Sequence, residues 1–158
     1  MTQETECRFD CTIDLNRERA FSLFVDRTEL WWSWPFSGEN GSVDAGIDPF
    51  AGGSCYETDE EGRRRIWGTV LSIEDPLFVR LAWQVAQDGT EIADPAAASR
   101  VMVNFREMAD ATRLEIVHTE FLRHGEFGEA YLRHMQQPEG WPRIIRNLQE
   151  AAKTAVWR

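Results

Sequence analysis

The most constraining feature of this sequence is a succession of alternating apolar segments followed by one long amphipathic segment. Five segments place apolar side chains at every second position, which is the period of a half-buried strand. They cover residues 54–58, 63–73, 78–85, 99–106 and 112–120. Most of the connections are short and polar, as at Asp59–Gly62, so consecutive strands are expected to pair antiparallel.

The segment that follows predicts a helix over residues 141–155. Its apolar side chains recur at i, i+3, i+4 and i+7, and Pro142 suits the first turn, where its missing N–H has no helical partner. At about 1.5 Å per residue such a helix is about 24 Å long, enough to cross a sheet. A shorter helix is predicted over 125–137, where Pro138 and Gly140 then break the chain.

The N-terminal part predicts another strand and two short helices. Residues 6–15 alternate, Asn16 is placed to cap a helix, and Thr28 is placed to cap a second helix that ends before Pro35. A weak strand is expected at 43–47. The predicted fold class is therefore α+β: a single domain over 1–158 in which a curved antiparallel sheet of six or seven strands wraps on a long C-terminal helix. A cavity between sheet and helix usually accompanies this arrangement.

Length and charge exclude several function classes. A chain of 158 residues has the size of one domain. Its 17 basic against 27 acidic residues, a net charge of −10, argue against binding to nucleic acid or to an anionic membrane. The start, Met1–Glu6, lacks the basic and apolar pattern of a signal peptide, and no apolar stretch has membrane-spanning length. We therefore expect a cytoplasmic protein.

Cysteines and histidines give no metal signature. Cys7 and Cys11 share one face of the first strand without a third ligand nearby, and His124 and His134 lack the i, i+4 spacing of a metal pair. We expect free thiols, no metal and no cofactor.

An ordered set of short motifs runs through nearly the whole chain. They are Ala20-Phe21, Glu29–Trp32, Gly52-Gly53, Trp67–Val70, Leu81–Trp83, Ser99–Val101, Thr112–Leu114, His118, Phe121 and Gly140-Trp141. By these motifs the chain resembles the START-like, or SRPBCC, superfamily of helix-grip proteins. Within that superfamily it resembles the homologues of the activator of the 90-kDa heat-shock protein ATPase. One departure is Glu120, since relatives often carry glycine before the residue that matches Phe121.

The resemblance implies the helix-grip fold and a binding cavity. Members of the superfamily hold lipids, sterols, plant hormones or polyketides there, and some are cyclases or hydroxylases. Many bacterial members of the family have no known activity. Because one fold hosts many functions, the site has to be argued from the residues of this chain.

Seven tryptophans against two tyrosines are the candidates for a cavity lining. Trp31, Trp32 and Trp34 cluster with Phe36 near the expected cavity mouth. Three tryptophans within four positions cannot all point inward, so at least one is expected to be partly exposed. The other aromatic candidates are Trp67, Trp83, Phe105 and Trp141. The competing interpretation is core packing, which we favour for Trp83 and Trp141.

Two polar residues follow the inward phase of the last strand. His118 is in phase with Leu114 and Ile116, so it points to the concave face as a ligand contact or, as we favour, as a satisfied core histidine. Glu120 continues this phase and lies either at the cavity rim or in solvent. Arg80 and Arg106 have the opposite phase and are expected on the convex face.

Three functions remain open at this stage. The leading hypothesis is a protein that binds a small apolar or aromatic molecule, acting as a monomer or homodimer. One alternative is a cyclase- or hydrolase-like enzyme with His118 as the best acid/base candidate and Glu120 behind it, although the sequence shows no catalytic set. The other alternative, a chaperone-interacting module, follows from the family name only.

Overall fold

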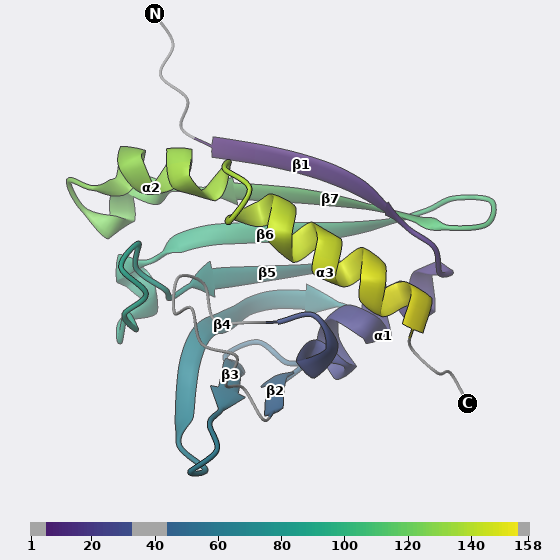
Figure 1. Ribbon diagram of the computed structural model, residues 1–158, viewed down its shortest axis with the longest axis horizontal. Coiled ribbons are helices and arrows are strands. Elements are labelled where there is room, and N and C mark those ends of the chain that lie inside the picture. The colour runs from purple at the N-terminus through teal and green to yellow at the C-terminus, as the bar shows by residue number, and fades with distance from the viewer. Residues whose placement is uncertain (1–5, 33–43, 155–158) are drawn as a thin grey trace, which may run out of the picture.

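The computed structural model describes residues 6–32 and 44–154 of the chain. Seven strands form one antiparallel sheet in the order β1-β7-β6-β5-β4-β3-β2 (Figure 1). The strands are β1 (Glu6–Ile13), β2 (Asp44–Ile47), β3 (Ser54–Thr58), β4 (Arg64–Glu74), β5 (Phe78–Trp83), β6 (Ser99–Glu107) and β7 (Thr112–Thr119). The helices are α1 (Arg17–Asp26), α2 (Gly128–Met135) and α3 (Trp141–Thr154), with single 3-10 turns η1 (Thr28–Leu30), η2 (Pro95–Ala97) and η3 (Phe121–His124).

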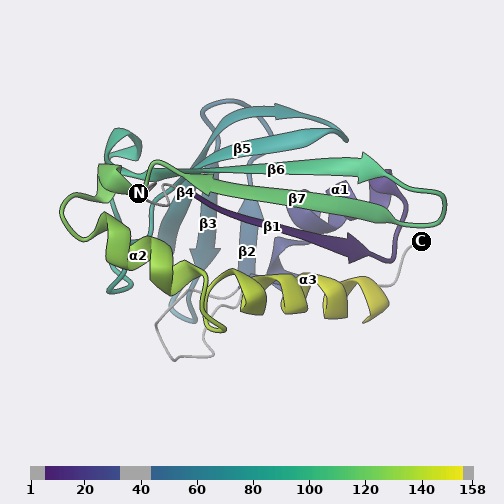
Figure 2. The same ribbon diagram turned by 90° about the horizontal axis from the view of Figure 1, so that it is seen from above.

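The curved sheet holds α3 along its concave side, with α1 beside it at one end (Figure 2). Strand β1 does not pair with its sequence neighbour β2 but with β7, so that Cys7 lies opposite His118. The predicted α+β class and the helix-grip architecture are therefore confirmed, with seven strands.

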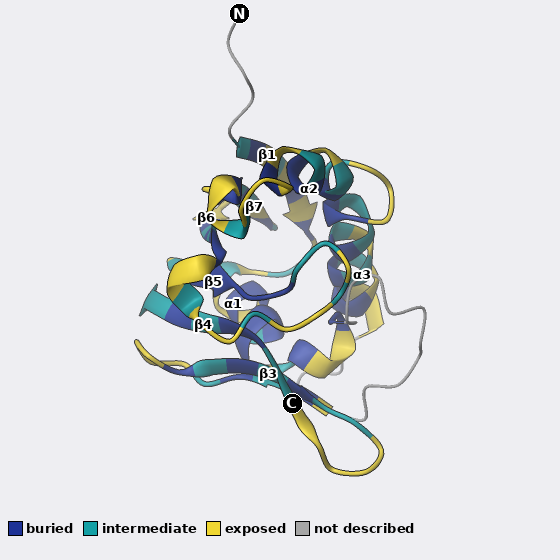
Figure 3. Ribbon diagram, turned by 90° about the vertical axis from the view of Figure 1, so that its left-hand side faces the viewer, coloured by how far each residue is buried: buried dark blue, intermediate teal, exposed yellow. Residues whose placement is uncertain are grey.

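Alternation along the strands decides what enters the core. In β7 the side chains of Leu114, Ile116 and His118 are buried while Arg113 is exposed. The neighbouring strand β6 has the same inward phase, because Val101 lies directly opposite His118 in the sheet. Buried side chains from the strands and α3 consequently form one core. Figure 3 colours the ribbon by how far each residue is buried.

The convex face carries the opposite phase, as predicted. Arg106 is exposed there and forms an ion pair with Glu115 across β6 and β7. The hairpin between β3 and β4 is also charge-paired, because Arg63 contacts both Asp59 (2.9 Å) and Glu61 (2.8 Å).

The predicted cap of α1 is confirmed, whereas the predicted second short helix is reduced to a single turn. The side chain of Asn16 accepts a hydrogen bond from the Arg19 N–H (2.9 Å), as expected for a cap. Thr28, however, does not cap a following helix, since its hydroxyl donates back to the carbonyl of Phe24 (3.0 Å). It thereby closes the end of α1, and only the single turn η1 follows.

Two other predicted boundaries were wrong. The helix expected over 125–137 is shorter, since α2 covers only Gly128–Met135 and follows the turn η3 closely. A side chain at Gly128 would come within 2.4 Å of the Phe121 carbonyl oxygen. Glycine therefore allows α2 to start directly against η3. Strand β5 ends at Trp83, and Val85 instead forms an isolated bridge with Glu91.

Candidate functional site

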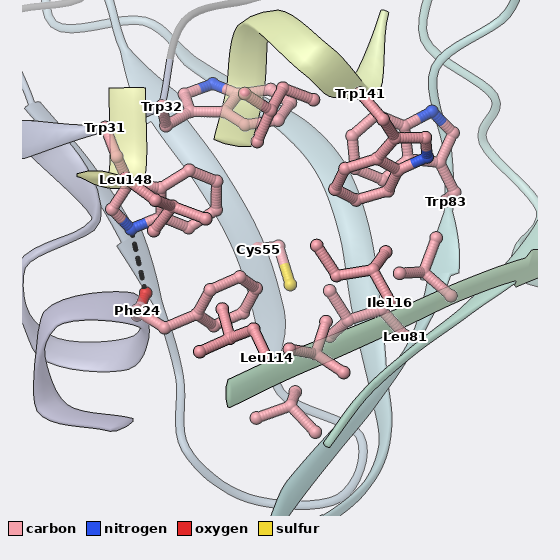
Figure 4. Close-up of a cluster of buried hydrophobic side chains, with 14 of the residues drawn as sticks. Phe24, Trp31, Trp32, Cys55, Leu81, Trp83, Leu114, Ile116, Trp141 and Leu148 are labelled. Carbon is pink, nitrogen blue, oxygen red and sulfur yellow. Dashed lines mark hydrogen bonds between the residues drawn. The ribbon is translucent and has the colours of Figure 1, made fainter. Parts of the chain in front are cut away.

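The five tryptophans that the structure describes form a continuous cluster between the sheet and the helices (Figure 4). The rings of Trp32 and Trp67 stack with centroids 3.9 Å apart. Trp67 lies 5.9 Å from Trp83, which in turn lies 5.3 Å from Trp141 at the start of α3. The predicted packing role of Trp83 and Trp141 is therefore confirmed.

Burial also extends to the cluster that follows α1. Trp31 and Trp32 are only 3% and 4% exposed, because η1 turns both rings inward. Trp31 donates to the carbonyl of Phe24 (3.2 Å), and Trp32 donates to the carboxylate of Glu57 (3.1 Å). Trp34 and Phe36 lie outside the described residues, so exposure within this group stays a prediction.

Phe105 likewise belongs to the core, where its ring lies edge-on to Phe21 at 5.1 Å. Most of the predicted lining residues thus pack against one another. Their contact with a ligand stays a prediction.

Two neighbouring tryptophans differ in their hydrogen bonding. Trp83 donates to the hydroxyl of Tyr131 (2.8 Å), which donates to the carbonyl of Val85 (2.5 Å). The indole N–H of Trp67 is buried and has no hydrogen-bond partner among the described residues.

His118 is enclosed by partners on both ring nitrogens. The Trp141 indole N–H donates to Nδ1 (2.9 Å), and Nε2 lies 2.6 Å from the Ser99 hydroxyl oxygen. An indole nitrogen can only donate, so Nδ1 is an acceptor and the proton of the neutral ring is on Nε2. His118 therefore donates to Ser99.

The chain of hydrogen bonds continues from Ser99 to His124. Nε2 of His124 accepts both the Ser99 backbone N–H (3.1 Å) and its hydroxyl (2.7 Å). The proton of a neutral His124 ring is then on Nδ1, a buried atom without a hydrogen-bond partner among the described residues. The order of donors is Trp141, His118, Ser99, with His124 as the final acceptor.

Both histidines are kept neutral by their surroundings. Burial, assisted by the nearby His124, holds the pKa of His118 well below its usual value. Burial lowers the pKa of His124 to about 4. The neutral forms required by the hydrogen-bond pattern are thus the forms expected near pH 7.

This network was only partly predictable. The inward phase of His118 was correct. Ser99 carried one usable signal, a hydroxyl at an inward position two residues before Val101. His124 carried none, because it lies on a single turn without strand or helix periodicity.

A pocket of about 720 Å³ lies beside this network, at the end of the sheet where β5 leads into the 84–98 loop. The loop forms one wall, and η3 with the start of α2 forms the other. Its lining consists of Ala86, Gln87, Asp88, Ile92, Ala97, Arg123, His124, Phe127 and Tyr131. The buried Tyr131 contrasts with Phe127, which is 67% exposed. None of these residues belongs to the cavity lining that the sequence predicts.

Arg123 links the two walls of this pocket and forms an ion pair with Glu120. Arg123 donates to the carboxylate of Glu120 (3.0 Å) and to the carbonyl of Ala96 (2.9 Å) on η2. Of the two positions considered for Glu120, the structure shows an exposed side chain in this ion pair. Its backbone has a φ of 59°, the left-handed conformation in which glycine is favoured.

The part of the chain that the structure describes contains no group of three or more His, Cys, Asp or Glu side chains placed to hold a metal ion. None of its helices combines the length and the apolarity needed to cross a membrane.

The sheet, the enclosed C-terminal helix and the end pocket define the class of protein: a helix-grip protein of the START-like, or SRPBCC, superfamily. The family model described as "Activator of Hsp90 ATPase homolog 1-like protein" matches residues 14–153. The chain belongs to that family. No curated protein matches the chain significantly in sequence.

Solved structures share the fold over almost the full length. The self-sacrificing resistance protein CalC from Micromonospora echinospora is 25% identical, with a TM-score of 0.65 and 94% of each chain covered. The anthrahydroquino-γ-pyrone synthase Txn09 is 23% identical, with a TM-score of 0.63, and 91% of this chain and 97% of that chain are covered. Protein NE0264 from Nitrosomonas europaea is 16% identical, with a TM-score of 0.66 and 97% of each chain covered.

Proposed function

We propose that this protein binds a small, flat, largely apolar molecule in the pocket between the 84–98 loop and the η3–α2 segment. The observation that carries the proposal is the pocket itself. Its volume of about 720 Å³ falls in the range of about 300–1,000 Å³ typical of small-molecule sites. Its lining joins the aromatic rings of Tyr131 and Phe127 to a few polar groups.

The floor of the pocket is held rigidly. The Tyr131 hydroxyl is fixed between Trp83 and the carbonyl of Val85, and His124 is fixed by Ser99. A site whose side chains are already ordered loses less conformational entropy on binding. Two proteins of similar fold carry names that concern small molecules or resistance, a synthase of an anthrahydroquino-γ-pyrone and CalC.

Binding is favoured over the enzyme alternative by the state of the histidines. Both nitrogens of His118 are engaged and its side chain is fully buried, so it has no nitrogen for a substrate. Ser99 and His124 have the spacing of a nucleophile and its base, but Ser99 is 0% exposed.

The test is a titration with N-phenyl-1-naphthylamine, a neutral probe whose fluorescence rises in apolar sites. We expect saturable binding to the protein. Ala97→Phe should weaken that binding at least about tenfold because it places a ring in the pocket. The matched control is Ala96→Phe, on the neighbouring exposed residue that does not line the pocket. Absence of saturable binding, or equal effects of the two variants, would refute the proposal.

A further inference from the structure

The charged groups of the pocket are not equivalent. Arg123 is neutralised by Glu120, and another of its N–H groups is used by the Ala96 carbonyl. Asp88, on the opposite wall, takes part in no salt bridge within the described residues. The uncompensated charge of the pocket is therefore the carboxylate of Asp88.

The turn that carries Asp88 holds this carboxylate in place. One of its oxygens, Oδ1, accepts the hydroxyl of Thr90 (2.7 Å) and the Thr90 backbone N–H (3.0 Å). These hydrogen bonds hold the pKa of Asp88 below its usual value, so the group is ionised at neutral pH. No described hydrogen bond engages Oδ2, which leaves this oxygen for a ligand.

The carboxylate lies near aromatic rings. Asp88 lines the same pocket as Phe127 and Tyr131, and its charge adds to burial in raising the pKa of Tyr131. A carboxylate that shares a pocket with aromatic rings is the chemistry that recognises an organic cation, since aromatic ring faces are electronegative and the carboxylate supplies the counter-charge.

We propose that the pocket selects flat aromatic molecules that carry a protonated amine, with Asp88 as counter-ion and Phe127 as a ring face for the cation. This inference rests on the proposed function, because it names the chemical class of the ligand for the same pocket. The overall charge of −10 favours the approach of such a cation.

Three naphthalene probes that differ in charge test the inference by displacement of N-phenyl-1-naphthylamine. They are 1-naphthylmethylamine, the neutral 1-naphthylmethanol and the anionic 1-naphthoate. The amine should bind about fivefold to tenfold more tightly than the alcohol, as one exposed ion pair and one cation–π contact allow together. The anionic 1-naphthoate should bind more weakly than 1-naphthylmethanol. Added salt should reduce the preference for the amine.

Three variants test whether Asp88 and Phe127 cause the preference for the amine. Asp88→Asn should bring the affinities for amine and alcohol to within about twofold while leaving the alcohol unchanged. Phe127→Leu should reduce the preference partly. Asp110→Asn is the charge-matched control, because Asp110 lies in the turn between β6 and β7, at the opposite end of the molecule from α2 (Figure 1). It should retain the full preference.

The outcomes separate the two proposals. If neither N-phenyl-1-naphthylamine nor any naphthalene probe binds, the proposed function is wrong and the inference falls with it. If the neutral probes bind but the amine has no advantage, or keeps its advantage in Asp88→Asn, only the inference about charge is overturned.

Discussion

Replacement of Glu120 by glycine should relieve strain at the junction of β7 and η3. Glu120 has φ 59° and ψ 38°, and a Cβ in this left-handed region costs about 1–2 kcal/mol. Glycine removes that cost. It also gives up the ion pair with Arg123, whose side chains are 42% and 39% exposed, so this loss amounts to about 0.2–1 kcal/mol.

Alanine at the same position separates the two contributions. Glu120→Ala loses the same ion pair but keeps the Cβ. Glycine has the larger unfolded-state entropy, a penalty of about 0.4–1 kcal/mol, which offsets part of the strain relief. We therefore expect Glu120→Gly to be about 1 kcal/mol more stable than Glu120→Ala, and Glu120→Ala to be less stable than the wild type by about 0.5 kcal/mol.

Urea unfolding followed by circular dichroism measures these differences. Glu150, whose ion pair with Lys153 lies in α3, supplies a control in helical backbone. At this position the order should reverse, and the free energy of unfolding of Glu150→Gly should be about 1 kcal/mol lower than that of Glu150→Ala. If glycine is no more stable than alanine at position 120, the left-handed backbone is not a source of strain and the reasoning fails.

Three other predictions concern the buried polar groups. Ser99→Ala should lower the free energy of unfolding by about 2–3 kcal/mol, because Nε2–H of His118 loses its acceptor inside the core; a loss below about 0.5 kcal/mol in urea titrations would contradict the network. Trp83→Phe should destabilise more than Trp67→Phe by about 1 kcal/mol, since only the Trp83 N–H has a described partner; thermal unfolding of the two variants compares them. Both histidines have lowered pKa values in the folded protein. Below about pH 6.5 they bind protons in the unfolded chain but stay neutral in the folded protein, so the free energy of unfolding is highest above this pH and falls as the pH falls. Unfolding free energies between pH 7 and pH 5 should therefore decline by up to about 1.4 kcal/mol per pH unit from the fully buried His118, with less from His124, and a flat profile would exclude neutral buried rings.

The fold was predictable because its signals are periodic. Alternation identified the inward phase of β7, including His118, and the 3.6-residue pattern identified α3. Where a single close contact decided the structure, periodicity gave no information. The start of α2 at Gly128 depends on a close contact with a carbonyl of η3, and the hydrogen bond of Thr28 back to Phe24 depends on the end of α1.

The candidate site was predicted less well for the same physical reason. Trp83 and Trp141 were correctly predicted to lie in the core, but Trp31 and Trp32 were expected near an opening and are buried. The pocket is lined mainly by turn and loop residues such as Asp88 and Ala97. Residues of this kind meet through tertiary structure, and their positions follow no local pattern.

The pairing of β1 with β7 also bears on how the chain folds. Glu6 lies opposite Thr119, so the first strand has no place in the sheet until the seventh strand has been synthesised. Until then the apolar face of β1, with Cys7 and Ile13, stays uncovered. Contacts between such distant segments slow folding, and we expect β1 to join late, as the step that completes the core.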